Sequence, residues 1–160
     1  MNKKVILIGH YGVGKTSLVK RFVHSMFSEE YITTIGVKID KKTVTVNGTS
    51  VNLLIWDIAG ESSQQKVPQS YRLGAHGALY VFDLSRPSTY QQIEEEINSL
   101  KALLPNIPVE ILGNKADLVT KEEIDQVSQQ IHPLKASLTS AKTGEHVDDA
   151  FEKLTQSMMV

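Results

Sequence analysis

The chain has 160 residues, of which 41% are hydrophobic and 22% charged, as expected for one globular domain with an apolar core and not for a disordered or fibrous chain. Lys and Arg number 17 against 18 Asp and Glu, which gives a net charge of −1. The sequence also shows no basic face or tail, so nucleic acid is not an expected partner. The absence of cysteine excludes disulfides, thiolate metal sites and cysteine-linked lipid anchors, and Asn2 excludes N-myristoylation. A cytoplasmic protein without its own lipid anchor is predicted.

Short apolar runs alternate with amphipathic stretches, a pattern typical of strands and helices taking turns in a mostly parallel sheet. Strands are predicted at about 3–9, 37–46, 51–57, 77–83, 109–113 and 134–138. Helices are predicted at about 15–25, 65–73, 87–103, 121–130 and 144–158. Asn47-Gly48 is a hairpin signal between the second and third strands, so that pair is expected to be antiparallel at the sheet edge. The prediction is one α/β domain over 1–160, with six strands and about five flanking helices.

An acidic run and two histidines are expected either to have a structural role or to face solvent. In the helix at 87–103, apolar residues recur at helical spacing, and the acidic run 94–96 is expected to face solvent. His76 stands at the start of a strand, where a histidine commonly satisfies a backbone group. His10 is expected to point outward.

Residues 9–16, Gly-His-Tyr-Gly-Val-Gly-Lys-Thr, fit the phosphate-loop pattern G-x-x-x-x-G-K-[ST] between a predicted strand and a predicted helix. Glycines allow backbone N–H groups to turn toward phosphates, and the helix N-terminus adds the positive end of its dipole. Lys15 would reach the β- and γ-phosphates, and the Thr16 hydroxyl would bind Mg²⁺. The motif predicts a P-loop NTPase fold.

Two further motifs also end apolar strands, where a parallel sheet delivers functional side chains. Asp57 precedes a turn ending in Gly60, so it could hold Mg²⁺ through water while the Gly60 N–H senses a γ-phosphate. In Asn114-Lys115-Ala116-Asp117, the Asp117 carboxylate can accept hydrogen bonds from guanine N1–H and its 2-amino group, which adenine does not present. This favours GTP over ATP.

With these motifs the chain resembles the Ras-like small GTPases over essentially its whole length, and it is most similar to the Rab branch. Residues 31–37 resemble switch I, with Thr34 as a Mg²⁺ ligand, and 139–142 resemble the loop whose backbone contacts guanine. Phe27 matches an aromatic residue that packs against the base. The resemblance implies GTP and GDP with Mg²⁺ as ligands, and as partners effector proteins, an exchange factor and a GTPase-activating protein of a monomeric switch.

The implied site residues fall into three groups. The nucleotide contacts are Tyr11, Gly12, Val13, Gly14, Lys15, Thr16, Ser17, Phe27, Tyr31, Thr34, Gly60, Asn114, Lys115, Asp117, Ser140, Ala141 and Lys142. The Mg²⁺ residues are Thr16, Thr34 and Asp57. The catalytic residues are Lys15, Thr34, Gly60 and Glu61. Trp56 and Tyr71 match two of three effector-facing aromatic residues of the Rab branch, and Ile39 occupies the third position.

Two departures from the family pattern bear on turnover. Glu61 replaces the usual Gln that orients the attacking water, and its charge beside a γ-phosphate costs free energy unless the site compensates. Tyr11 introduces a ring where an activator's arginine would approach. The main hypothesis is therefore a switch that hydrolyses GTP slowly, and the alternatives are a nucleotide-binding module with little or no hydrolysis, or a GTPase domain cut from a larger protein. A metabolic P-loop kinase or ATPase is disfavoured, because such enzymes need a lid lined with arginines for phosphoryl transfer and this chain has three scattered arginines.

Overall fold

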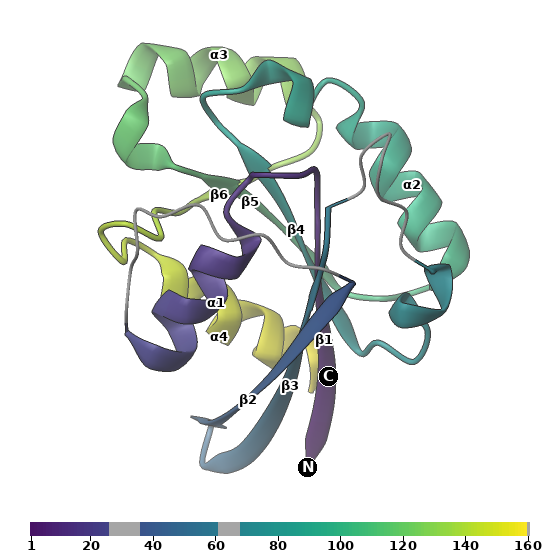
Figure 1. The fold of residues 1–160 in the computed structure, drawn as a ribbon. Coiled ribbons are helices and arrows are strands. Elements are labelled where there is room, and N and C mark those ends of the chain that lie inside the picture. Colours follow the sequence, from purple (N-terminus) through teal and green to yellow (C-terminus); the bar gives the residue numbers. More distant parts are fainter. Residues whose placement is uncertain (26–35, 61–67, 160) are drawn as a thin grey trace.

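The computed structural model describes residues 1–25, 36–60 and 68–159 (Figure 1). The strands are β1 (Asn2–Ile8), β2 (Val37–Val46), β3 (Thr49–Ile58), β4 (Gly77–Asp83), β5 (Val109–Asn114) and β6 (Ser137–Leu138). The α-helices are α1 (Lys15–His24), α2 (Ile93–Leu103), α3 (Lys121–Ile131) and α4 (Val147–Met158), with short 3₁₀ helices at Gln69–Arg72, Pro87–Thr89 and Ala116–Leu118. Within the described ranges, no helix is long and apolar enough to cross a membrane.

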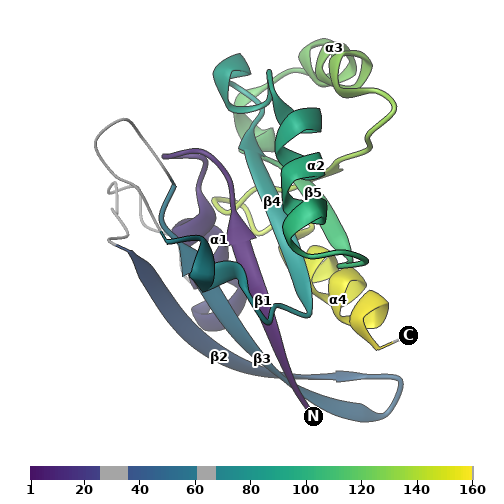
Figure 2. The ribbon, with the colours of Figure 1, turned by 90° about the vertical axis from the view of Figure 1, so that its right-hand side faces the viewer.

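One six-stranded sheet, in the order β2-β3-β1-β4-β5-β6, confirms the predicted α/β architecture. Among the strands in the described residues, only β2 and β3 pair antiparallel, and the other neighbouring strands pair parallel. Asn47 and Gly48 join β2 to β3 with φ values of 50° and 77°, the positive values that a tight hairpin turn requires. This turn lies at the same end of the molecule as the N-terminus in both views (Figures 1 and 2).

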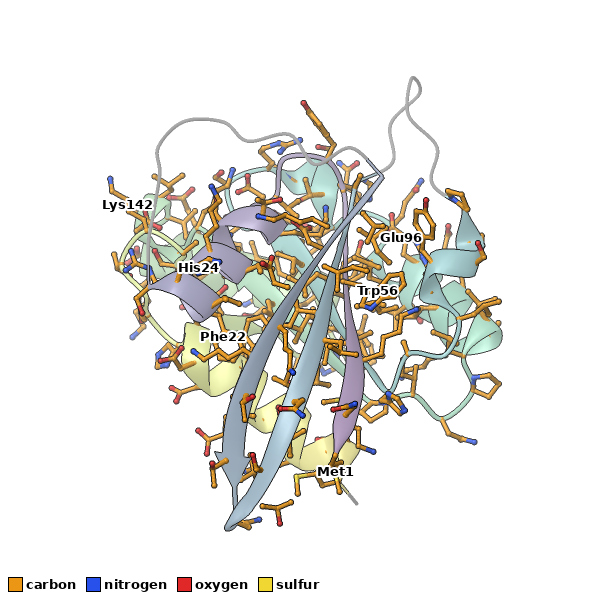
Figure 3. The ribbon with its side chains drawn as sticks, turned by 60° about the horizontal axis from the view of Figure 1, so that its bottom comes forward. Met1, Phe22, His24, Trp56, Glu96 and Lys142 are labelled. Atoms are coloured by element: carbon orange, nitrogen blue, oxygen red, sulfur yellow. The ribbon has the colours of Figure 1, made fainter. Side chains whose placement is uncertain are left out.

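Helices cover both faces of the sheet, because side chains along each strand alternate between the faces. In β1, Val5 and Leu7 join the core beneath α1 and α4, whereas Ile6 and Ile8 join the core beneath α2 and α3. Figure 3 shows Phe22 with α1 on one side of the long strands, and Trp56 and Glu96 on the other. The strands therefore form a middle layer with a buried set of side chains on each face.

The predicted helix at 65–73 is wrong in its described part, where a 3₁₀ turn at Gln69–Arg72 follows Pro68. The helix predicted from 87 begins at Ile93, because Pro87–Thr89 forms a turn in which the buried Thr89 hydroxyl bonds the backbone of Asp83. The last helix begins at Val147, not 144, because His146 has a positive φ of 56°. Four α-helices are thus present in the described part of the chain.

The expectation for His76 is confirmed. Its Nδ1 atom accepts a hydrogen bond from the Lys4 backbone N–H at 2.8 Å, and its own backbone N–H donates to the Lys4 carbonyl at 2.8 Å. The imidazole therefore continues the β1–β4 ladder by one step, just before β4 begins at Gly77.

Candidate nucleotide-binding site

The predicted motifs meet at one end of the sheet. The loop at 9–14 follows β1, residues 57–60 end and follow β3, and residues 114–117 end and follow β5. Since β1, β3 and β5 run in the same direction, their carboxyl ends share one edge. The segment 139–142 joins them after β6. This edge lies opposite the β2–β3 turn.

Close backbone packing explains the glycines of the phosphate loop. A Cβ atom on Gly9 would lie 2.1 Å from the Val81 carbonyl oxygen, and one on Gly60 would lie 2.5 Å from the Tyr11 backbone nitrogen. Gly14 precedes α1 with a φ of 101°, a value that side-chain-bearing residues rarely adopt. The loop is therefore pressed between β4 and the end of β3, and only glycine fits at these contacts.

Lys15 is the best buried cation of this loop, with 6% of its surface exposed. Its Nζ atom donates to the carbonyl oxygens of Gly9 and His10, each at 3.0 Å. Burial lowers its pKa to about 8, although the nearby Asp57 carboxylate opposes this shift. This ammonium group could therefore donate to phosphate oxygens in place of the two carbonyl oxygens when a nucleotide binds.

Thr16 and Asp57 meet at the start of α1. The Thr16 hydroxyl donates to Asp57 Oδ2 at 2.5 Å, and Asp57 is 1% exposed. A hydroxyl and a carboxylate provide the oxygen ligands that Mg²⁺ prefers. These two residues therefore fit the predicted magnesium site.

Asn114 and Lys115 connect the base motif to the phosphate loop. The Asn114 amide donates to the Val13 carbonyl at 3.0 Å and accepts a bond from the Thr139 hydroxyl at 3.2 Å. Lys115 Nζ donates to the Gly12 carbonyl at 3.0 Å and lies 2.9 Å from Asp83 Oδ2. Asp83 was not among the predicted site residues, although it is an acidic residue at the end of a buried strand, which is the signal that identified Asp57.

The segment at 139–142 is held on two sides. The Ser140 hydroxyl donates to Asp117 Oδ1 at 2.7 Å. From α1, Arg21 Nε donates to the Ala141 carbonyl at 2.8 Å, and its guanidinium also donates to the Lys142 carbonyl. Arg21 was not predicted as a site residue, because 120 residues separate it from Ala141 in the sequence.

The expectations for His10 and Glu96 are wrong. Glu96 is half-buried, His10 Nε2 donates to its Oε1 atom at 2.6 Å, and the Tyr80 hydroxyl donates to its Oε2 atom. Burial favours a higher pKa for Glu96, but the two hydrogen bonds and the positive charges of His10 and Arg72 lower the pKa overall. Burial, and then the bond to Glu96, raise the pKa of the Tyr80 phenol.

A pocket of about 490 Å³ lies beside this cluster. It is bounded by the end of β1, the end of β3, α2 and the segment preceding β4. Its lining residues are Ile8, Gly9, His10, Ile58, Ala59, Pro68, Arg72, Tyr80, Gln92, Glu95, Glu96 and Ser99.

Apolar side chains are exposed near β2 and β3. Ile39 lies opposite Trp56 in the register of these strands and is 51% exposed. The Trp56 and Tyr71 rings have centroids 6.5 Å apart. Lys4 Nζ lies 3.7 Å from the Trp56 ring centroid and donates to the Leu73 carbonyl, so a cation from β1 packs over this ring.

The remaining predicted residues divide into two sets. Tyr11 is 41% exposed, and its carbonyl accepts a hydrogen bond from Arg86 at 3.2 Å. Ser17 lies in the first turn of α1. Those that lie outside the described residues are Phe27, Tyr31, Thr34 and Glu61.

Comparisons with known proteins agree on one family. The model of the Ras family matches residues 4–160. Ras-related protein Rab-13 of Bos taurus is 33% identical over 163 residues, which cover 98% of this chain and 80% of that protein. Ras-related protein Rab-4B of Homo sapiens is 36% identical over 161 residues, which cover 98% of this chain and 76% of that protein.

Proposed function

This chain belongs to the Ras family, within which it resembles the Rab branch, and we propose that it is a monomeric cytoplasmic switch that binds GTP, hydrolyses it slowly to GDP and recruits effector proteins in the GTP state. Ras-family proteins are small GTPases that bind GTP and GDP, and Mg²⁺ is the usual ion. The slow turnover and the recruitment of effectors are specific to the proposal.

The observation that carries the proposal is the convergence of four loops on one edge of the sheet, joined by the Asn114–Val13 hydrogen bond. This bond connects the base motif directly to the phosphate loop, so one guanine nucleotide would contact both. Asp117 would accept hydrogen bonds from the guanine edge, and the backbone of 140–142 would contact the guanine oxygen. The loop N–H groups, the α1 N-terminus and Lys15 would bind the phosphates.

The fit of Thr16 and Asp57 to an oxygen-ligated ion supports a magnesium site there. When bound, Mg²⁺ would neutralise phosphate charge. Thr16 would supply a hydroxyl ligand, Asp57 would hold a bound water from its buried carboxylate, and Thr34 would add a ligand in the GTP state only. Gly60 would place its N–H at the γ-phosphate, and Glu61 would accept a hydrogen bond from the attacking water.

The exposed Ile39 and the partly buried rings of Trp56 and Tyr71 support an effector surface on β2, β3 and the 3₁₀ turn at Gln69–Arg72. This surface includes or borders the two segments, 27–37 and 58–72, that a GTPase switch would order around the γ-phosphate. A protein bound there would therefore distinguish the arrangement that GTP favours from the one that GDP favours. The same regions would receive the exchange factor and the GTPase-activating protein.

The deciding experiment measures the affinities for GTP, GDP and ATP together with single-turnover GTP hydrolysis. We expect both guanine nucleotides to bind about 10⁴-fold or more tightly than ATP, because a carboxylate facing the adenine edge would be left without donors. Comparable ATP and GTP affinities would refute the proposal. Tight GTP binding without hydrolysis over many hours would favour the alternative, a nucleotide-binding interaction module.

Two variants test the roles of Tyr11 and Glu61, the residues that depart from the family pattern. Glu61→Ala should lower the single-turnover rate if the carboxylate orients water. Tyr11→Gly should leave the intrinsic rate nearly unchanged and increase the response to an arginine-finger activator, because the exposed ring is removed from the activator's approach. A lower intrinsic rate or weaker GTP binding in Tyr11→Gly would instead assign the tyrosine hydroxyl a direct contact with the γ-phosphate.

A further inference from the structure

His10, the second residue of the phosphate loop, is hydrogen-bonded through its side chain to helix α2. The two atoms, His10 Nε2 and Glu96 Oε1, lie 2.6 Å apart, and the side chains are only 37% and 30% exposed. The second carboxylate oxygen of Glu96 accepts from the Tyr80 hydroxyl on β4. Glu96 is therefore fixed by two partners and ties the loop to a helix 86 residues away in sequence.

The backbone carbonyl of His10 contacts two residues that are expected to bind the γ-phosphate, Lys15 and Gly60. Its carbonyl oxygen accepts a hydrogen bond from Lys15 Nζ at 3.0 Å. A Cβ atom added to Gly60 would lie 2.7 Å from the carbon of the same carbonyl group, so the two backbones are in contact. A shift of the His10 backbone would therefore displace the carbonyl oxygen that holds Lys15 and would disturb the contact with Gly60 at the same time.

We propose that Glu96 is a positioning residue for the γ-phosphate side of the nucleotide site and that it acts through His10. The inference rests on the proposed function, since it concerns the binding of GTP. Its effect falls on GTP more than on GDP, because the Gly60 N–H is expected to contact only the γ-phosphate and Lys15 is expected to contact the γ-phosphate in addition to the β-phosphate that GDP also presents. The lowered pKa of Glu96 keeps the acceptor ionised, and a charged acceptor strengthens its hydrogen bonds.

The test compares the affinities of a non-hydrolysable GTP analogue and of GDP in matched variants. Glu96→Gln removes the charge with little change of shape, and His10→Ala removes the donor. Each should weaken analogue binding relative to GDP binding by about threefold to tenfold. This is less than the roughly tenfold or more that a hydrogen bond to a charged group is worth, because the bond acts on the nucleotide only through the loop backbone. His10→Gln should restore the parent ratio in part, because its side-chain amide can donate to Glu96 from a similar position.

Two further variants separate positioning from general destabilisation. Glu95→Gln removes the exposed neighbouring charge of the same helix and should leave the ratio unchanged. The double variant His10→Ala/Glu96→Gln should show no larger change in the ratio than His10→Ala alone, because both changes act on the same charge-assisted bond. Thermal unfolding of every variant identifies losses that come from stability alone.

Several outcomes would overturn the inference. An unchanged ratio in Glu96→Gln, an equal loss for both nucleotides, or additive effects in the double variant would each leave the His10–Glu96 pair as a structural contact only. These outcomes leave the proposed function intact as long as the parent protein binds guanine nucleotides. A parent protein that binds neither the analogue nor GDP would refute the proposed function and this inference with it.

Discussion

The buried ammonium group of Lys15 makes phosphate binding sensitive to pH. Burial lowers its pKa from 10.5 to about 8, so a growing fraction of the nucleotide-free protein has a neutral Lys15 as the pH rises through 8. A phosphate binds the charged form and raises this pKa again. The contribution of Lys15 should therefore make GDP affinity change little with pH near pH 7 and fall as the pH rises above 8.

Calorimetry in buffers of different ionisation enthalpy measures this linkage directly. With a pKa of about 8, the Henderson–Hasselbalch relation gives an uptake of about 0.1 proton on GDP binding at pH 7 and about 0.8 proton at pH 8.5. The protonation of GDP itself is measured without protein and subtracted. Equal proton uptake at the two pH values would show that Lys15 is charged throughout this range.

Motif residues were predictable from the sequence because their chemistry depends on local spacing. The phosphate loop lies between β1 and α1, and Asp57 and Asn114 lie at strand ends, as their patterns indicate. The partners of these residues were not predictable in the same way. Periodicity places Glu96 on a helix, but its contact with His10 depends on how α2 packs over the sheet. Similarly, no local signal joins Arg21 to the loop at 139–142.

Among the helices, prediction succeeded best where the ends are encoded locally. Helix α3 begins after Thr120, whose hydroxyl accepts from the Glu123 N–H at 3.2 Å, while the Glu123 carboxylate accepts from the Thr120 N–H at 3.1 Å. This reciprocal cap is visible in the sequence as Thr-x-x-Glu. The start of α2 was missed, because the bonds of Thr89 to Asp83 extend the turn after β4.

The cap of α3 provides a test of this local encoding. Thr120→Ala removes the hydroxyl acceptor and should lower the free energy of unfolding by about 1 kcal/mol. Thr120→Ser retains a hydroxyl at the same position and should cost only a few tenths of a kcal/mol. Urea unfolding at a fixed saturating GDP concentration compares the two with the parent. Equal losses in both variants would mean that the threonine methyl group, and not the cap, stabilises the helix start.

One stacked aromatic pair lies where α1 packs against α4. The Phe22 and Phe151 rings are stacked with centroids 3.9 Å apart, and Phe151 is 1% exposed. Phe151→Ala should lower the free energy of unfolding by about 3 to 5 kcal/mol, because it leaves a cavity in the core beneath these helices. Leu118→Ala, at a residue that is 61% exposed, is the control and should change it by less than about 0.5 kcal/mol. Urea unfolding measures both, and similar losses would contradict the assignment of Phe151 to the core.

Across the whole molecule, the proposed base motif has two separable tasks. Asn114 is 1% exposed and joins β5 to the phosphate loop and to Thr139, so it holds three parts of the fold together. Asp117 is exposed, and the Ser140 hydroxyl donates to it near the surface. Replacing Asn114 should therefore weaken the protein itself, whereas replacing Asp117 should change only the base that it selects.

The prediction is that nucleotide-free Asn114→Ala loses about 2 to 3 kcal/mol of unfolding free energy, because the Val13 carbonyl and the Thr139 hydroxyl lose a buried partner. Nucleotide-free Asp117→Asn should stay within about 0.5 kcal/mol of the parent protein. In nucleotide binding, Asp117→Asn is the variant with the specific effect: it should bind xanthosine diphosphate more tightly than GDP, since its amide can donate to the 2-oxo group. Urea unfolding and competition binding measure the two effects separately. Unchanged GDP affinity in Asp117→Asn would refute its role in base recognition, and an unchanged stability in Asn114→Ala would show that the three loops hold their arrangement without this side chain.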